Sequence, residues 1–116
     1  MDYKFINTEY LDSVSGGDHE IINEIVSMFR EQVVEMYNEM RTLLADRNYS
    51  SLGMLAHKAK SSVAIMGMND LAEMLKKFEL QARDGKDSDL YESYISRFRD
   101  DTEEAVKELD DLVNKR

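Results

Sequence analysis

Apolar residues recur along most of this chain at intervals of three and four, which is the spacing of one face of an α-helix. No stretch alternates apolar and polar residues over the length of a useful β-strand. The longest apolar stripe starts after Asp18 and reaches about Asp46. Its members are Ile21, Ile22, Ile25, Phe29, Val33, Met36, Met40, Leu43 and Leu44. The pattern therefore predicts helix from end to end.

Glycines and capping residues divide this pattern into one short and four long helices. The first helix is expected over 8–14, with Thr8 as N-cap, and ends at Ser15-Gly16-Gly17. The second begins at the N-cap Asp18 and ends at a turn over 47–50, and the third ends at Gly67. The fourth has Asn69 or Asp70 as N-cap and ends at Gly85, and the last starts at Asp87 or Ser88. In the last helix the inward or partly inward positions include Leu90, Tyr94, Ile95 and Phe98.

Short connections between long helices place successive helices antiparallel. The expected fold is therefore all-α, an up-down-up-down four-helix bundle with a short additional N-terminal helix across one end. A chain of 116 residues is long enough for one domain with one core. We expect residues 1–116 to form that single domain.

Composition narrows the classes of function. A net charge of −9 disfavours nucleic acid and anionic membrane surfaces as partners. No apolar run approaches the roughly 20 residues that a bilayer crossing needs, and the N-terminus lacks the form of a signal peptide. The chain has no cysteine, which excludes disulfides, thiolate metal ligands and cysteine nucleophiles. A cytoplasmic location is expected.

His57 is the residue most informative about chemistry. The apolar stripe of its helix is formed by Leu52, Leu55, Ala56, Ala59, Val63 and Met66. His57 lies roughly 150° from the centre of that stripe, so its imidazole is expected to face water. Its helical neighbours Gly53, Ser61 and Ala64 are small, which leaves the ring accessible, and Lys60 supplies a positive charge.

The other familiar chemistries are missing. There is no glycine-rich phosphate loop, and neither histidine has the glutamate three residues before it that a di-iron bundle needs. No metal site or cofactor is therefore expected in this chain. His19, between Asp18 and Glu20, is interpreted as an ordinary surface histidine.

An exposed neutral imidazole is nucleophilic through one nitrogen when the other nitrogen carries the proton. Glu79, on the flank of the next helix, is the expected acceptor that orients His57. Lys60 is expected to stabilise the negative oxygens of an incoming phosphoryl group. Lys58 is expected only to add to the local field, and Arg83 either to assist or to pair with Glu79. Alternatively, the two lysines are ordinary solvated residues.

These residues resemble the histidine-containing phosphotransfer (HPt) domains of multistep phosphorelays. The family pattern is roughly Ala-His-x-Leu-Lys-Gly-Ser, a glycine about ten residues after the histidine, and a leucine-rich helix ending in Glu or Gln. The matching positions are Ala56-His57-Lys58-Ala59-Lys60-Ser61-Ser62, then Gly67, then Leu71 to Phe78-Glu79, with Gly17-Asp18, Ile21-Ile22 and Met28-Phe29 upstream. Ala59 departs from the usual leucine and Ser61 from the usual glycine; Ser61 is still small enough for close approach.

The resemblance implies that His57 accepts a phosphoryl group from an aspartyl phosphate on one receiver domain and passes it to another. The implied partners are response-regulator receiver domains, including that of a hybrid sensor histidine kinase. The resemblance places Mg²⁺ and the acidic pocket on the receiver. A single phosphoaccepting histidine requires no dimer, so a monomer is expected.

The resemblance further implies a docking surface around the histidine. The candidates on its outer arc are Gly53, Met54, Ser61, Ala64, Ile65 and Met68. Exposed Met and Ile there would form an apolar patch that needs a partner. The alternative is that Ile65 and Met68 tuck into the helix junction at Gly67.

Two other functions stay open at this point. One is the phosphoacceptor part of a histidine kinase, which usually has an acidic residue after its histidine and a proline soon after; this chain has Lys58 and no proline. The other is a non-catalytic helical adaptor, for which His57 would be incidental.

Overall fold

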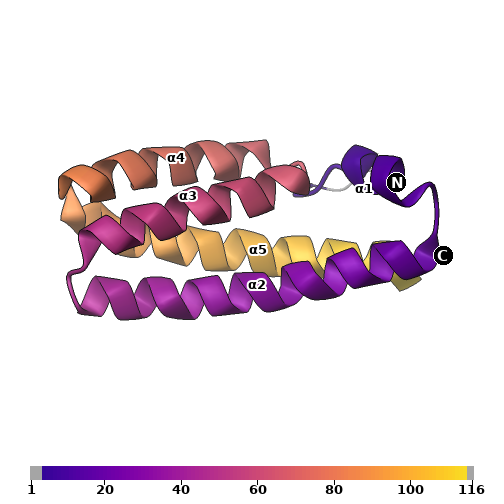
Figure 1. Cartoon of the computed structure of the whole chain (residues 1–116), viewed down its shortest axis with the longest axis horizontal. Coiled ribbons are helices and arrows are strands. Elements are labelled where there is room, and N and C mark those ends of the chain that lie inside the picture. Colours follow the sequence, from indigo (N-terminus) through magenta and orange to yellow (C-terminus); the bar gives the residue numbers. More distant parts are fainter. Residues whose placement is uncertain (1–3, 115–116) are drawn as a thin grey trace.

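The computed structural model describes residues 4–114, which form helices joined by short turns and no strands (Figure 1). In chain order the elements are α1 (Glu9–Ser15), α2 (His19–Ala45), α3 (Tyr49–Ile65), α4 (Asn69–Asp84), the 3₁₀ turn η1 (Ser88–Leu90) and α5 (Tyr91–Asn114). The predicted all-α class and the helix count are confirmed.

The four long helices lie along one axis and alternate in direction, while α1 lies at the end where both chain termini are found (Figure 1). α3 packs most extensively on α4, and α2 packs on α5; α2 also contacts α3, and α4 contacts α5. The helices therefore follow one another around the bundle. The outer face of the α3–α4 pair lies opposite the outer face of the α2–α5 pair.

Several predicted boundaries are confirmed. Asp18 caps α2, because its side chain accepts from the backbone N–H groups of Glu20 and Ile21. Gly85 ends α4 with a positive φ of 65°, a conformation that glycine adopts without steric cost. Gly67 follows α3 with φ at 77°.

Thr8 occupies the predicted N-cap position of α1, although its side chain makes no capping hydrogen bond. Other predicted boundaries are wrong. Neither Asn69 nor Asp70 caps α4, since Met68 occupies that position and the helix begins at Asn69. The turn after α2 is shorter than predicted because the Asn48 side chain accepts from the Ser51 N–H and starts α3 at Tyr49. A 3₁₀ turn separates Asp87 from α5.

The core is apolar and continuous, but two residues predicted to face it are exposed. Ile21 is 38% exposed, and so is Leu90. Ile21 lies about 100° around α2 from the buried stripe that contains Ile22, Val26 and Phe29. Leu90 lies in η1, before the first residue of α5, so it does not follow the helical period of α5.

Tyr91 joins the beginning of α3 to the end of α4. It is fully buried, and its ring meets that of Tyr49 edge-on, with centroids 5.2 Å apart. Its hydroxyl lies 2.8 Å from the carbonyl oxygen of Gln81 and 2.5 Å from that of Lys86. Burial raises the pKa of Tyr91 above its usual value near 10. These contacts hold the start of α3 and the end of α4 against the start of α5.

Candidate functional site

Gly53 sets the separation of α3 from α4. A Cβ atom at this position would lie 2.9 Å from Arg83 Cγ, 3.1 Å from the Glu79 carbonyl oxygen and 3.2 Å from the Arg83 nitrogen. Gly53 is buried under α4. Its prediction as an exposed docking residue is therefore wrong, and its place is in the interface between the two helices.

This close approach brings the predicted histidine and glutamate together. His57 Nδ1 lies 3.0 Å from Glu79 Oε1. The His57 side chain is 54% exposed, whereas the Glu79 side chain is 8% exposed. A carboxylate only accepts hydrogen bonds, so Nδ1 donates and holds the proton of the neutral ring. The lone pair of that ring is then on Nε2.

Two cations neutralise the buried carboxylate of Glu79. Arg83, one turn further along α4, places Nη2 2.9 Å from Glu79 Oε2. Lys60 Nζ lies 3.9 Å from Oε1, the same oxygen that meets His57. A buried carboxylate without cations would be strongly disfavoured. Of the two roles expected for Arg83, pairing with Glu79 is the one that the structure supports, and it leaves Oε1 directed at the imidazole.

The remaining candidates of α3 divide into exposed and buried residues. Met54 is 64% exposed and Ile65 is 42% exposed, and Lys58, Ser61 and Ala64 are also exposed. Met68 is 4% exposed and belongs to the core, so its prediction as a docking residue is wrong. The chain turns at Gly67, which points Met68 inward; the alternative of a tuck into this junction holds for Met68 but not for Ile65.

Residues of the neighbouring helices extend this surface beyond the predicted set. A groove of about 260 Å³ between α2 and α3 is lined by Ile25, Met28, Phe29, Gln32, Ser62, Ile65 and Met66. Met28 is 60% exposed, and Leu80, next to Glu79 on α4, is 55% exposed. The exposure of Leu80 could have been predicted from the sequence, because Leu80 lies off the apolar stripe of α4. Met28 falls off the stripe of α2, but its nearness to α3 depends on the packing of the two helices.

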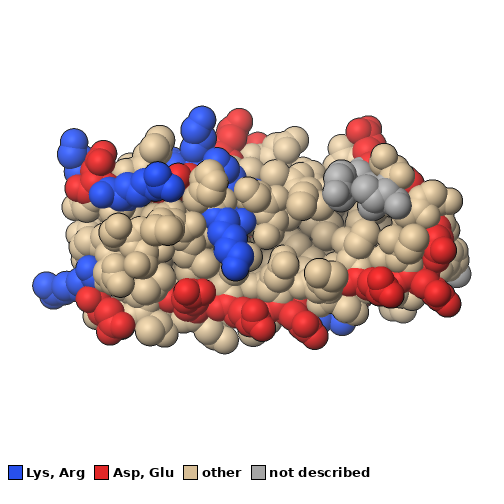
Figure 2. Space-filling view, in the orientation of Figure 1, with Lys and Arg blue, Asp and Glu red and all other residues tan. Residues whose placement is uncertain are grey.

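The charges around His57 differ from those of the rest of the visible face. Figure 2 shows Lys and Arg side chains gathered over α3 and α4, and a row of Asp and Glu side chains along α2.

Among residues 4–114, no three or more His, Asp or Glu side chains come close enough together to hold a metal ion. No helix in the same range is long and apolar enough to span a membrane.

A comparison of the sequence with known protein families agrees with this arrangement of His57 and Glu79. The model of the Hpt domain matches residues 24–115, which include all of α3, α4 and α5 and most of α2. Comparisons with curated proteins and with solved structures gave no match. Because the family match covers well over half of the chain, the chain belongs to the Hpt domain family.

Proposed function

We propose that this chain is a phosphocarrier that accepts a phosphoryl group on His57 from an aspartyl phosphate of one receiver domain and passes it to an aspartate of another. Hpt domains are phosphocarrier modules of phosphorelays, without an ATP site of their own, and they interact with receiver domains. The observation that carries the proposal is an exposed imidazole whose Nδ1 is held by a nearly buried carboxylate.

Transfer begins with Nε2 of His57, which carries the lone pair of a half-exposed ring. Nε2 attacks the phosphorus in line with the bond to the aspartyl oxygen. The new N–P bond forms as the P–O bond breaks, and the receiver aspartate leaves as a carboxylate. The ring becomes positively charged while Nδ1 keeps its proton, and the carboxylate of Glu79, 3.0 Å away, stabilises that charge.

Lys60 is proposed to meet the phosphoryl oxygens. An ammonium group has three donors, so Lys60 can stay beside Glu79 and still donate to the phosphoryl group. Such transfer depends mainly on positioning and on stabilisation of charge. Mg²⁺ is expected on the receiver, and no cofactor on this chain. We propose that the chain acts in the cytoplasm as a single monomeric domain.

The direct test is transfer of label from a receiver domain phosphorylated with ³²P. The expected product is a label on this chain that is lost in acid and kept in alkali, and that mass spectrometry locates to His57. Receiver domains that bind the chain without transferring label would favour a helical adaptor. A label that arrives from ATP alone would contradict a carrier without its own ATP site.

Replacing Glu79 by Ala is expected to slow transfer about tenfold. The variant loses a hydrogen bond to a charged group, and about 1.4 kcal/mol corresponds to a tenfold change in rate. Glu79→Gln should recover part of the rate, because its amide oxygen can still accept from Nδ1. Rapid-quench measurement of single-turnover transfer checks this, with circular dichroism to show an intact fold. Equal rates for wild type and Glu79→Ala would remove Glu79 from the mechanism.

Replacing Lys60 by Ala is expected to slow transfer severalfold with little change in the unfolding midpoint, since the Lys60 side chain remains 28% exposed. Lys58→Ala is the matched control: it removes the same charge two residues away, from a side chain that is not directed at Glu79. The same rapid-quench assay compares the two variants. If both variants slow transfer equally, Lys60 contributes only to the local field.

A further inference from the structure

Four exposed glutamates form a stripe on the side of α2 that borders α3. Glu24, Glu31, Glu35 and Glu39 follow one another at intervals of 7, 4 and 4 residues, so they share one face of the helix. Met28, which lines the α2–α3 groove, lies on the same stripe. Figure 2 shows the row of acidic side chains along α2. These four residues are named the acidic edge.

Cations lie on the other side of His57. Lys76 and Arg83 stand three residues before and four residues after Glu79, so they share the side of α4 that faces α3. Lys60 approaches Glu79 from α3. Glu79 neutralises one of these three charges, so this basic edge, formed by Lys60, Lys76 and Arg83, stays positive. Figure 2 shows Lys and Arg side chains over α3 and α4.

Between the two edges the surface is apolar or small, apart from the exposed Lys58. Helical spacing places Met54, Ser61 and Ile65 on the α2 side of His57, because Ser62 and Ile65 line the α2–α3 groove while Lys60 meets Glu79 on the other side. Met54 and Ile65 are exposed by 64% and 42%. A partner can therefore approach closely here, with one edge of each sign flanking the contact.

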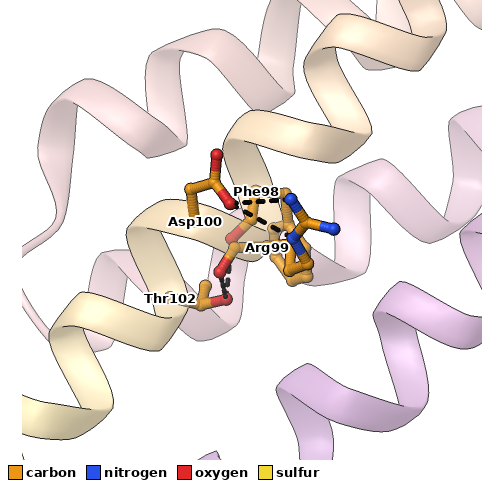
Figure 3. A network of polar contacts seen from close by, with 4 residues as sticks. All are labelled: Phe98, Arg99, Asp100 and Thr102. Carbon is orange, nitrogen blue, oxygen red and sulfur yellow. Dashed lines mark hydrogen bonds and ion pairs between the residues drawn. The ribbon is translucent and has the colours of Figure 1, made fainter.

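Charges on the opposite side of the bundle are arranged differently. On α5, Arg97 pairs with Asp101, Arg99 with Asp100 and Lys107 with Glu104. Figure 3 shows Arg99 directed at Asp100, while the Thr102 hydroxyl donates to backbone carbonyl oxygens of its own helix. The hydrogen bond to Asp100 raises the pKa of Arg99. These charges are largely satisfied within the chain.

The acidic edge has no such partners. In the range 4–114, none of its four carboxylates forms an ion pair, and Lys58 and Lys76 form none either. Glu31 and Glu35, and Glu35 and Glu39, are like charges four residues apart, an arrangement that destabilises a helix. Unpaired charges of opposite sign on either side of one surface are suited to an external partner of complementary pattern.

We infer that the opposite charges of the acidic edge and the basic edge select the receiver domain and fix the orientation in which it docks. The favoured partner carries Lys or Arg on the side of its phosphoaspartate pocket that faces α2, and carboxylates on the side that faces α4. A receiver rotated by half a turn about the line from His57 to its phosphoaspartate would place like charges together. Such contacts weaken binding. This inference rests on the proposed function, because it concerns the partner of the same histidine.

The test reverses the acidic edge and compares it with a matched reversal elsewhere. Glu31→Lys/Glu35→Lys alters the edge, and Glu103→Lys/Glu104→Lys makes the same change in net charge on α5, where both residues are exposed. The probes are receiver domains encoded in the same genome, each phosphorylated with acetyl phosphate. The measured quantity is the second-order rate constant of transfer at low salt and at about 0.5 M salt, where exposed charges are screened.

With the receiver that the wild type prefers, the acidic-edge variant is expected to transfer at least tenfold more slowly at low salt, and the difference should shrink at high salt. The α5 variant should stay within twofold of the wild type. Lys76→Glu, on the other edge, should also slow transfer. Equal rates for the two double variants, or faster transfer by both because the chain is less negative, would overturn the inference.

A small donor separates this inference from the proposed function. Phosphoramidate phosphorylates histidine without protein docking, so it should label His57 at the same rate in the wild type and both double variants. Failure to label the wild type would contradict the proposed function itself. Normal labelling, with transfer rates that do not depend on the acidic edge, would contradict only the inference that the two charged edges select and orient the receiver.

Discussion

A His57→Gln variant is expected to take up no phosphoryl group from a phosphorylated receiver domain while folding like the wild type. The amide nitrogen of glutamine has no lone pair available for attack on phosphorus, so the loss should be complete. The His57 side chain is 54% exposed, and the amide N–H of glutamine can still donate to Glu79. A change in unfolding free energy within about 0.5 kcal/mol is therefore expected. Acid-labile label after incubation, and the midpoint of urea unfolding, check the two parts.

His19→Gln is the matched control. It makes the same substitution at the other histidine of the chain, which is exposed at the start of α2. This variant should be labelled at the wild-type rate. Label on His57→Gln equal to that on the wild type would refute the assignment of His57, whatever the behaviour of Glu79 and Lys60.

The helices and the orientation of His57 were predictable because both depend on local spacing. The apolar stripe of α3 is buried as its period predicts, from Leu52 to Val63, and this places the imidazole outside. Asp18 and Gly85 act where their backbone chemistry predicts. The pairing of Glu79 with His57 needed one further step, the antiparallel packing of successive helices, which short connections favour.

Errors arose where packing between helices decides the outcome. On a helical wheel Gly53 and His57 share a face, and the wheel does not show that α4 crosses α3 at Gly53. The helical period of α3 puts Met68 on the outer arc only if the helix continues, but α3 ends at Ile65 and the turn at Gly67 redirects the chain. A single-helix pattern contains neither the crossing point nor the path after a turn.

The acidic edge was also outside the reach of local pattern. The sequence shows exposed glutamates on α2, but their relation to His57 follows from the groove that joins α2 to α3. In the same way, the sequence left open whether Arg83 assists the histidine or pairs with Glu79, and the distance of 2.9 Å between Arg83 Nη2 and Glu79 Oε2 supports pairing.

The crossing at Gly53 leads to the second large effect. A Gly53→Val variant is expected to lose about 1–3 kcal/mol of unfolding free energy, the usual cost of overpacking. Arg83 Cγ, at 2.9 Å from the added Cβ, belongs to a flexible side chain and can move. The Glu79 carbonyl oxygen at 3.1 Å and the Arg83 nitrogen at 3.2 Å are backbone atoms, so α4 itself must shift. The shift withdraws Glu79 from His57, and transfer should slow at least as much as in Glu79→Ala.

Gly53→Ala separates helix propensity from crowding in this prediction. Alanine adds the same Cβ without the two further methyl groups of valine, so α4 must give by only a few tenths of an ångström. The gain of up to about 1 kcal/mol over glycine inside a helix offsets part of that crowding, so this variant should lose less stability than Gly53→Val. Ala64→Val controls for a β-branched residue at an exposed position of the same helix. Labelling by phosphoramidate and urea unfolding compare all three variants without a docking step. A Gly53→Val protein as stable and as quickly labelled as Ala64→Val would show that the close approach of α3 and α4 is not what holds Glu79 against the imidazole.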